Sequence, residues 1–303
     1  MAVRNQAPVA LITGAARGIG EGLARVLVAR GYHVSLVGLE FQKLRSLAAE
    51  LNQPGQPERA VAYKADVTDS KALERAVAQT INEFGRINVL VVNAGIANNG
   101  SFASTHVEDL ARVVNVNLIG AVRTMKAAYE ALLLTRGYVL FISSASAFPA
   151  LPGITAYGAS KAGVDHLANN LRLELRTSGV DVGVAYPSWI DTDLVRDQAE
   201  ELPYFRKALA AEPMFFGKVT SLVDCVDRLV EGIELRSRRI YIPEWVGLMH
   251  LLRTATVSKV WDFAVGFFSG RMLPEMSQEA RDLGRSFGKT SVETTRPAVD
   301  DAP

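Results

Sequence analysis

The chain has 303 residues, of which 49% are hydrophobic, and a formal net charge of +1 at pH 7. This is enough apolar material for a sizeable core, and the near-zero charge gives no reason to expect a nucleic acid or a strongly acidic partner. Cys225 is the only cysteine, so an internal disulfide is excluded and a reducing compartment is compatible. The histidines, at positions 33, 106, 166 and 250, are dispersed, and no metal site is predicted.

A strand, a glycine turn and a helix are predicted at the N-terminal end. The apolar run from Pro8 to Ile12 indicates a strand, and because the fold uses this run we expect no secretion signal. TGAARGIG follows at residues 13–20, before a helical pattern. Gly14 and Gly18 permit a tight turn and close backbone approach, and the helix N-terminus offers free N–H groups to a pyrophosphate. Ordinary turn glycines are the alternative.

Further strands and helices alternate along the chain. Apolar runs at residues 33–37, 60–63, 89–92, 138–142 and 182–185 predict strands, and residues 71–84 and 110–134 have helical periodicity. Alternating strands and helices are typical of a parallel sheet with helices on both faces. We therefore predict an α/β fold with a Rossmann-like doubly wound sheet.

Ser144, Tyr157 and Lys161 lie within the single segment 144–161. Tyr157 and Lys161 are four residues apart, which puts both side chains on one helix face. The ammonium should lower the pKa of Tyr157 from its usual value of about 10, so that the phenol acts as an acid or base. Ser144 follows a predicted strand, at the sheet edge where ligands bind, and can hydrogen-bond the same substrate oxygen. Such a pair is also common on exposed helices, so the rest of the sequence has to decide whether this pair is catalytic.

The end of the chain is predicted as a helix at 221–235, a basic turn, and a last strand at 240–243. We expect one domain over residues 1–243, an apolar helical extension over 244–288 and a disordered polar tail over 289–303. Charged residues such as Arg253, Lys259 and Asp262 argue against a membrane-spanning helix. We favour packing of the extension on the core or a second subunit, with pocket closure or contact with a membrane surface as alternatives.

Seven motifs in this order and spacing resemble the short-chain dehydrogenase/reductase family over residues 8–195, with weaker similarity up to about Pro243. They are TGAARGIG at 13–20, ADV at 65–67, NAG at 93–95, VNVNLIG at 114–120, Ser144, YGASK at 157–161 and PSWIDTD at 187–193. The resemblance implies that Ser144, Tyr157 and Lys161 are catalytic.

The resemblance also implies a fourth catalytic residue, an asparagine at a distorted point of its helix. In the family this asparagine holds a water that links the lysine to solvent. Asn115 and Asn117 are the candidates. We favour Asn117, because it has the family's valine before it and the glycine three places after it.

An NAD(P) coenzyme follows from the same resemblance. Asp66 would meet the adenine amino group with help from the Val67 backbone, and Ile190 and Thr192 would hold the nicotinamide carboxamide. Asn93 and Gly95 would lie along the adenosine ribose. Capping of helix 71–84 is the alternative for Asp66, although residues 68–70 can supply that cap. The full predicted coenzyme set is Gly14, Arg17, Gly18, Ile19, Gly20, Gly38, Asp66, Val67, Asn93, Ala94, Gly95, Tyr157, Lys161, Pro187, Ile190 and Thr192.

Departures from the family pattern bear on the coenzyme. The usual Pro-Gly is Pro187-Ser188 here, which removes a flexible position beside the nicotinamide. At the end of the second strand the chain has neither an acid at position 38, typical of NAD users, nor an arginine at position 39, frequent in NADP users. Arg17 can pair with a 2′-phosphate and Gly38 leaves room for one, whereas Glu40 argues for NAD. Arg17 as a solvated loop residue is the alternative. We favour NADP(H).

The family's substrate lid corresponds to about residues 194–219 here. Its aromatic residues indicate a pocket for a bulky lipophilic molecule, because burial of apolar surface drives such binding. Trp189, Phe205 and Phe215 are the substrate candidates. The alternative is that these side chains only pack the lid onto the body.

We predict an NAD(P)-dependent oxidoreductase that interconverts a secondary alcohol and a ketone, with Tyr157 as acid and base. A non-catalytic nucleotide-binding sensor, or a scaffold that recruits a membrane or partner through its apolar extension, is the alternative. Retention of Ser144, Tyr157 and Lys161 favours the enzyme. We also expect a homodimer or homotetramer formed through helices 110–134 and 157–175, and a cytoplasmic location with peripheral membrane association left open.

Overall fold

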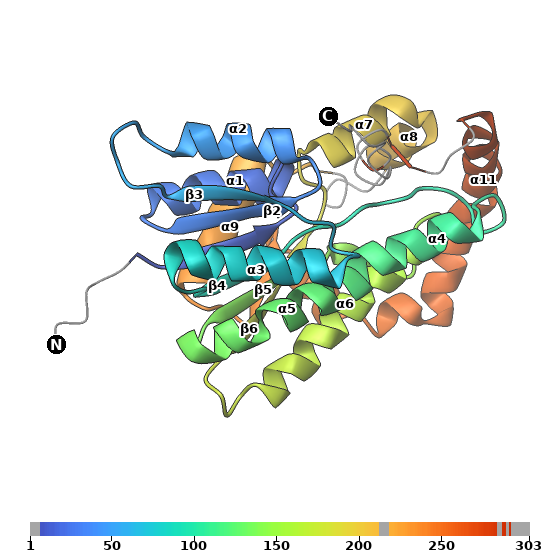
Figure 1. The fold of residues 1–303 in the computed structure, drawn as a ribbon. Coiled ribbons are helices and arrows are strands. Elements are labelled where there is room, and N and C mark those ends of the chain that lie inside the picture. The colour runs from blue at the N-terminus through green and yellow to red at the C-terminus, as the bar shows by residue number, and fades with distance from the viewer. Residues whose placement is uncertain (1–6, 212–217, 284–286, 289–290, 292–303) are drawn as a thin grey trace.

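The fold is built on one parallel β-sheet (Figure 1). The computed structural model describes residues 7–211, 218–283, 287–288 and 291. The strands are β1 (Val9–Thr13), β2 (His33–Gly38), β3 (Ala60–Lys64), β4 (Val89–Val92), β5 (Tyr138–Ile142), β6 (Asp181–Pro187) and β7 (Arg239–Ile242). Their spatial order is β3-β2-β1-β4-β5-β6-β7, and each neighbouring pair is parallel. The strand order reverses between β1 and β4, where ligands bind in open sheets of this kind.

Helices cover both faces of the sheet. They are α1 (Gly18–Ala29), α2 (Phe41–Leu51), α3 (Ser70–Phe84), α4 (Val107–Val114), α5 (Gly120–Thr135), α6 (Thr155–Glu174), α7 (Asp193–Glu201), α8 (Pro203–Ala211), α9 (Leu222–Glu234), α10 (Val246–Leu251) and α11 (Lys259–Leu283). One apolar core lies under α1, α2 and α9, and a second lies under α3, α5 and α6 (Figure 1). The predicted doubly wound, Rossmann-like α/β fold is confirmed.

Uninterrupted apolar runs explain the burial of the central strands. β1, β4 and β5 are buried at every position, as expected for parallel strands covered on both faces. Above them α1 and α9 approach closely, because a Cβ atom added at Gly22 would lie 2.6 Å from Val226. Cys225 beside it is fully buried, and burial raises the pKa of its thiol to about 12.

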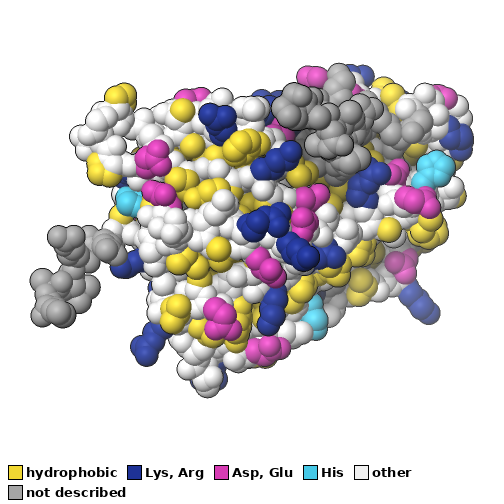
Figure 2. Space-filling model, viewed as in Figure 1, with side chains coloured by type: hydrophobic (Ala, Val, Ile, Leu, Met, Phe, Trp, Pro, Cys, Tyr) yellow, Lys and Arg dark blue, Asp and Glu magenta, His cyan; other side chains and the backbone are white. Residues whose placement is uncertain are grey.

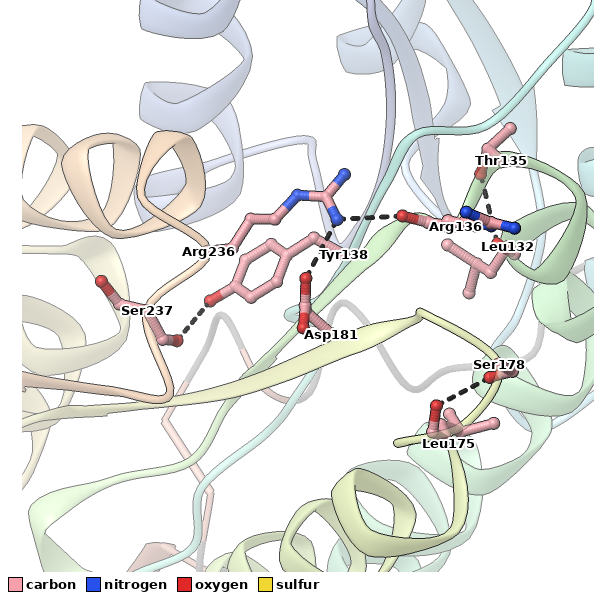
Figure 3. Close-up of polar contacts among 9 residues, drawn as sticks. All are labelled: Leu132, Thr135, Arg136, Tyr138, Leu175, Ser178, Asp181, Arg236 and Ser237. Atoms are coloured by element: carbon pink, nitrogen blue, oxygen red, sulfur yellow. Dashed lines mark hydrogen bonds and ion pairs between the residues drawn. The ribbon is translucent and has the colours of Figure 1, made fainter.

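Polar contacts close the amino ends of β5 and β6 (Figure 3). The Tyr138 hydroxyl donates to the backbone oxygen of Ser237 at 2.8 Å. Arg236 donates to the backbone oxygen of Arg136 at 2.9 Å and pairs with Asp181 at 3.0 Å. Burial raises the pKa of Tyr138, which keeps its hydroxyl a donor. These contacts hold the amino ends of β5 and β6 together, and the carboxyl ends of the strands are left for ligand binding.

One predicted helix is interrupted. Residues 110–134 are divided among α4, a π-helical turn at Asn115–Ile119, and α5. Such turns are frequent at functional sites. The turn contains both candidate asparagines, Asn115 and Asn117, so their segment departs from a regular α-helix.

The C-terminal part lies at the same end of the sheet as α7 and α8 (Figure 1). Several apolar side chains of this part are exposed, among them Leu251 at 77%, Val260 at 78% and Phe263 at 80%. No helix within the described ranges is long and apolar enough to cross a membrane. On the face drawn in Figure 2, basic and acidic side chains are interspersed, in keeping with the net charge of +1.

Candidate active site

A cavity of about 790 Å³ lies at the carboxyl ends of β1, β4, β5 and β6. With one exception, the predicted coenzyme residues line it: Gly14, Arg17, Gly18, Ile19, Gly38, Asp66, Val67, Asn93, Ala94, Gly95, Tyr157, Lys161, Pro187, Ile190 and Thr192. The exception is Gly20, which lies behind the loop, where a Cβ atom would overlap the Gly14 carbonyl oxygen. These coenzyme residues come from six separate stretches of sequence and meet around one space.

The glycine loop is held by the ends of β1 and β4. Gly14 and Gly18 have φ angles of +65° and +55°, a conformation that L side chains rarely adopt. The Asn93 amide donates to the backbone oxygens of Thr13 and Gly14 at 2.9 and 3.1 Å, and the Thr13 hydroxyl accepts from the Asn93 backbone N–H at 3.1 Å. Asn93 thus fixes the loop through its side chain, a role that the sequence reading did not identify.

Arg17 and Glu40 form an ion pair at the rim of the cavity. Arg17 Nε donates to Glu40 at 2.7 Å, a second guanidinium nitrogen contacts the other carboxylate oxygen, and Lys43 pairs with the same carboxylate at 2.8 Å. Burial alone would raise the pKa of Glu40, but the hydrogen bonds from Arg17 and Lys43 outweigh it and lower that pKa. Two cations therefore share one anion beside Gly38.

Asp66 is separate from the cap of the following helix. The Asp69 carboxylate caps α3 by accepting from the backbone N–H groups of Lys71 and Ala72 at 2.9 and 3.2 Å. The Asp66 carboxylate accepts only from the Thr68 N–H, at 2.8 Å, among the hydrogen bonds of the described chain, and Asp66 lines the cavity. The capping alternative for Asp66 is therefore wrong.

Ser144, Tyr157 and Lys161 come together at the centre of the cavity wall. Ser144 follows β5, whereas Tyr157 and Lys161 lie on the first turns of α6. The Ser144 hydroxyl hydrogen-bonds the Tyr157 phenol. Lys161 Nζ lies 5.7 Å from the Tyr157 ring centroid and donates to the Ile142 backbone oxygen at 2.9 Å. One hydroxyl, one phenol and one amine thus face the same space.

The predicted lowering of the Tyr157 pKa is wrong for this structure. Burial of the phenol raises its pKa, and the hydrogen bond from Ser144 offsets that only in part. The Lys161 ammonium lies over the ring and is bound to the Ile142 carbonyl. Burial also lowers the pKa of Lys161 to about 8, so its positive charge is itself weakened. Desolvation has the largest effect on the pKa of both groups, and the residue spacing does not reveal it.

Asn117 lies behind Gly95, next to the lysine. Its amide oxygen accepts from the Ile96 N–H at 2.9 Å, and its amide nitrogen donates to the Ile96 carbonyl at 2.9 Å and to Ser160 at 3.0 Å. A Cβ atom at Gly95 would lie 3.3 Å from Asn117 Oδ1 and 3.4 Å from Lys161 Nζ. Asn115 instead lines the cavity and accepts from Arg123 at 2.9 Å.

Two of the three predicted substrate residues line the cavity. Trp189 and Phe205 line the cavity, with their rings edge to face at 5.3 Å between centroids. Phe215 lies outside the described residues. Lid packing and pocket lining are thus both found, because Phe205 is buried on α8 and also borders the cavity.

The C-terminal extension also lines the cavity, which the sequence reading held only as an alternative. Trp261, Ala264 and Val265, at helical spacing, contribute one face of α11. The Trp261 indole donates to the Ala150 carbonyl at 2.9 Å, which anchors α11 on the loop before α6. Packing on the core is found as well, through fully buried Val246. Other lining residues that sequence reasoning missed are Trp245, Met249, Asn98, Asn99, Gln198, Arg112 and Ser291.

Comparison with protein families agrees with this geometry. The family model of short chain dehydrogenases matches residues 8–203. The chain belongs to the short-chain dehydrogenase family. The resemblance drawn from the seven motifs is confirmed, and the protein is an NAD(P)-dependent oxidoreductase acting on CH–OH and C=O groups.

Individual relatives of this short-chain dehydrogenase span most of its fold. Oxidoreductase UcpA of Salmonella typhimurium is 35% identical over 194 residues, covering 63% of this chain and 73% of the relative. An 11-beta-hydroxysteroid dehydrogenase-like protein, 4A, of Arabidopsis thaliana is 30% identical over 248 residues, covering 80% and 79%.

Solved structures of the family superpose on the same core. A variant of actinorhodin polyketide ketoreductase, solved with NADPH, has a TM-score of 0.71 and 26% identity, covering 80% of this chain and 97% of its own. A dehydrogenase/reductase from Sinorhizobium meliloti has a TM-score of 0.66 and 26% identity, covering 78% and 94%. About a fifth of this chain lies beyond the matched region in each case.

Proposed function

We propose that this enzyme interconverts a secondary alcohol and a ketone of a bulky lipophilic molecule, with Tyr157 as the acid and base. One observation carries the proposal: Ser144, Tyr157 and Lys161 line the same cavity as the aromatic side chains Trp189 and Trp261. One relative is named as hydroxysteroid dehydrogenase-like and one solved neighbour as a polyketide ketoreductase, and these names support a lipophilic substrate.

The chain's own groups supply the proton. In ketone reduction, Tyr157 donates its proton to the carbonyl oxygen, and the Ser144 hydroxyl hydrogen-bonds the same oxygen. Because burial raises the pKa of Tyr157, the phenol is protonated at neutral pH and suited to act as an acid. Lys161, with a pKa of about 8, is close enough to neutrality to return a proton, and Asn117 holds the backbone beside it.

The cavity fits a dinucleotide on the side of the glycine loop. Gly14 and Gly18 take left-handed backbone angles there, and Gly95 leaves open the space between Asn117 and Lys161 that a Cβ atom would enter. We assign residues 14–20 to the pyrophosphate, residues 66–67 to the adenine, residues 93–95 to the ribose and residues 187–192 to the nicotinamide. When bound, NAD(P) supplies or accepts the hydride.

Replacing Tyr157 with Phe tests the assignment of the acid. Loss of one positioned proton donor should lower kcat for a lipophilic ketone by about 10³-fold, with the Kd for the coenzyme changed by less than about threefold. The control is Tyr63→Phe, since Tyr63 lies on β3 with its hydroxyl on the Gln79 carbonyl at 3.3 Å. Substantial turnover by Tyr157→Phe refutes the acid role.

For the coenzyme we propose a preference for NADP(H). Arg17 and Lys43 both contact the Glu40 carboxylate, so two cationic side chains lie close to Gly38, where the 2′-phosphate is expected. Arg17→Met should weaken NADPH binding about tenfold and NADH binding much less, and Glu40→Gln should strengthen NADPH binding by a similar factor. Titration calorimetry with both coenzymes measures these shifts. Tighter binding of NADH than NADPH by the wild type contradicts this preference.

For assembly we propose a homodimer or homotetramer formed through α5 and α6. Apolar side chains on these helices are exposed, including Leu134 at 88% and Leu173 at 69%. Multi-angle light scattering of wild type and Leu173→Glu tests this, because a buried charge at an interface should shift the particle toward the monomer. A monomeric wild type disproves the association. The cytoplasmic location and the boundaries at residues 243 and 288 stay predictions.

A further inference from the structure

All of the tryptophans in the chain line the active-site cavity. The sequence has three, Trp189, Trp245 and Trp261, and each contributes to the lining. None of them is buried and none is fully exposed. Partial accessibility is common for a tryptophan, but core packing does not require that every one in a chain should border a single cavity. Their large flat rings therefore indicate a surface that a ligand covers.

The sheet places two of these tryptophans beside Ser144, on the side away from the glycine loop. Along the sheet the strands lie in the order β1, β4, β5, β6 and β7. The glycine loop follows β1 and Ser144 follows β5, whereas Trp189 follows β6 and Trp245 follows β7. Because neighbouring strands lie about 4.8 Å apart, the ends of β6 and β7 come directly after the reacting groups in this order.

Trp261 reaches the same region from the C-terminal extension. Its indole nitrogen donates to the Ala150 carbonyl at 2.9 Å, and Ala150 belongs to the loop that joins Ser144 to Tyr157. The indole nitrogen is the only polar atom of this side chain, so its hydrogen bond to the loop uses the donor that a ligand could otherwise take. Trp261 therefore offers a ligand its ring surface and no hydrogen bond.

Other side chains extend this ring-lined wall. Phe205 of α8 lies edge to face with Trp189, at 5.3 Å between ring centroids and with 78° between the ring planes. Met249 of α10 comes four residues after Trp245 and also lines the cavity. Aromatic rings favour the edge-to-face arrangement with one another, and a thioether favours the edge of a ring. These side chains therefore favour a ligand that has a ring face and a ring edge.

We propose that the substrate carries an aromatic ring, which this tryptophan-lined wall binds beside the carbonyl that reacts at Tyr157. Burial of apolar surface does not distinguish such a ring from a saturated one, because the saturated ring has the larger apolar surface. Each ring–ring contact adds about two- to tenfold in affinity beyond the area that it buries. This inference rests on the proposed function and narrows its substrate class to ketones that bear an aryl group.

Two ketones that differ only in the distal ring test this class. They are 4-phenylcyclohexanone and 4-cyclohexylcyclohexanone, which share the same carbonyl environment. Calorimetry uses enzyme saturated with oxidised coenzyme, which cannot reduce a ketone. The wild type should bind the phenyl compound about tenfold more tightly, although burial of area alone predicts that the cyclohexyl compound binds at least as well.

Substitution by leucine removes a ring and keeps an apolar side chain. Trp189→Leu and Trp261→Leu should each reduce the preference for the phenyl compound about threefold, because each removes one ring–ring contact. The matched control is Phe263→Leu, since Phe263 lies two residues from Trp261 on α11 and is 80% exposed. This control should keep the full preference.

Tryptophan fluorescence tests the same wall in the unaltered protein. Because every tryptophan of the chain lines the cavity, all of the tryptophan emission comes from this wall. Saturation with 4-phenylcyclohexanone should lower the quenching constant of acrylamide by about half, since a bound ligand covers the rings that line its pocket.

Three results overturn the aromatic class: wild type that shows no preference for the phenyl compound, a preference that survives both tryptophan substitutions, or acrylamide quenching that the bound ketone does not change. The proposed function fails separately. If reduced coenzyme gives no turnover of either ketone while the tryptophan-dependent preference is observed, the reaction assignment is wrong and the aromatic class stands. Turnover of both ketones without that preference keeps the reaction and removes the aromatic class.

Discussion

The two halves of the cavity are built in different ways. The coenzyme half (residues 14–20, 38–40, 65–68 and 93–95) is formed near the strand ends by backbone turns and glycines, which Asn93 ties together. The substrate half (residues 97–99, the lid, α10 and α11) is formed by side chains from distant segments, such as Ala97 and Ser291, 194 residues apart. The substrate half can therefore change its ligand by exchanging side chains, whereas the coenzyme half depends on backbone geometry.

Glycines provide the strongest test of this difference. A Cβ atom at Gly20 would overlap the Gly14 carbonyl and lie 2.8 Å from the Asn93 amide nitrogen, so Gly20→Ala should lower the free energy of unfolding by about 3 kcal/mol and abolish coenzyme binding. Gly270, within α11, has no atom within 4 Å of an added Cβ, and Gly270→Ala should stabilise by up to about 1 kcal/mol. Denaturant unfolding of both variants measures this, and equal effects would erase the distinction.

Lys161 lies where the coenzyme half meets the substrate half, and its burial should make the free energy of unfolding depend on pH. Burial lowers its folded-state pKa to about 8, below the ordinary 10.5, so between these values the unfolded chain holds a proton that the folded chain has lost. Stability contributed by this group therefore rises with pH over that window, by about 3 kcal/mol. The difference in unfolding free energy between wild type and Lys161→Met should show this rise. Parallel pH curves for the two proteins would contradict the burial of a lysine of low pKa.

Two aromatic residues on α11 test the substrate half at a smaller scale. Trp261 borders the cavity, whereas Phe263 is 80% exposed. Trp261→Ala should raise KM for a lipophilic ketone about tenfold with little change in kcat, since it removes apolar contact with the bound molecule. Phe263→Ala should leave KM and Tm within about twofold and 1 °C, as is usual for exposed sites. Equal KM values for both variants would exclude α11 from the substrate wall.

Features set by local rules were predictable from the sequence. The strands agree with the observed ones to within two residues at each end, because apolar runs between turn residues determine them. A cap for α3 was expected among residues 68–70, and the structure assigns it to Asp69. The distorted helix around Asn117 followed from the family resemblance and is found as a π-helical turn. The glycine loop lies where the motif indicates, beside Thr192.

Features set by distant contacts were not predictable. The pKa of Tyr157 depends on how much protein surrounds the phenol, and residue spacing reports the lysine but not the desolvation. The role of Trp261 depends on a contact with Ala150 across 111 residues.

The buried thiol of Cys225 has a practical consequence. It is the only cysteine in the chain, it is fully enclosed between α9 and its neighbours, and its pKa of about 12 leaves almost no thiolate at neutral pH. Alkylating dyes and spin labels should consequently ignore the native protein. A single cysteine introduced at an exposed position of α11 would then carry the only dye or spin label on the protein. Two introduced cysteines, one on the lid and one on the sheet, would report the distance between them during turnover. Neither experiment needs Cys225 to be removed first.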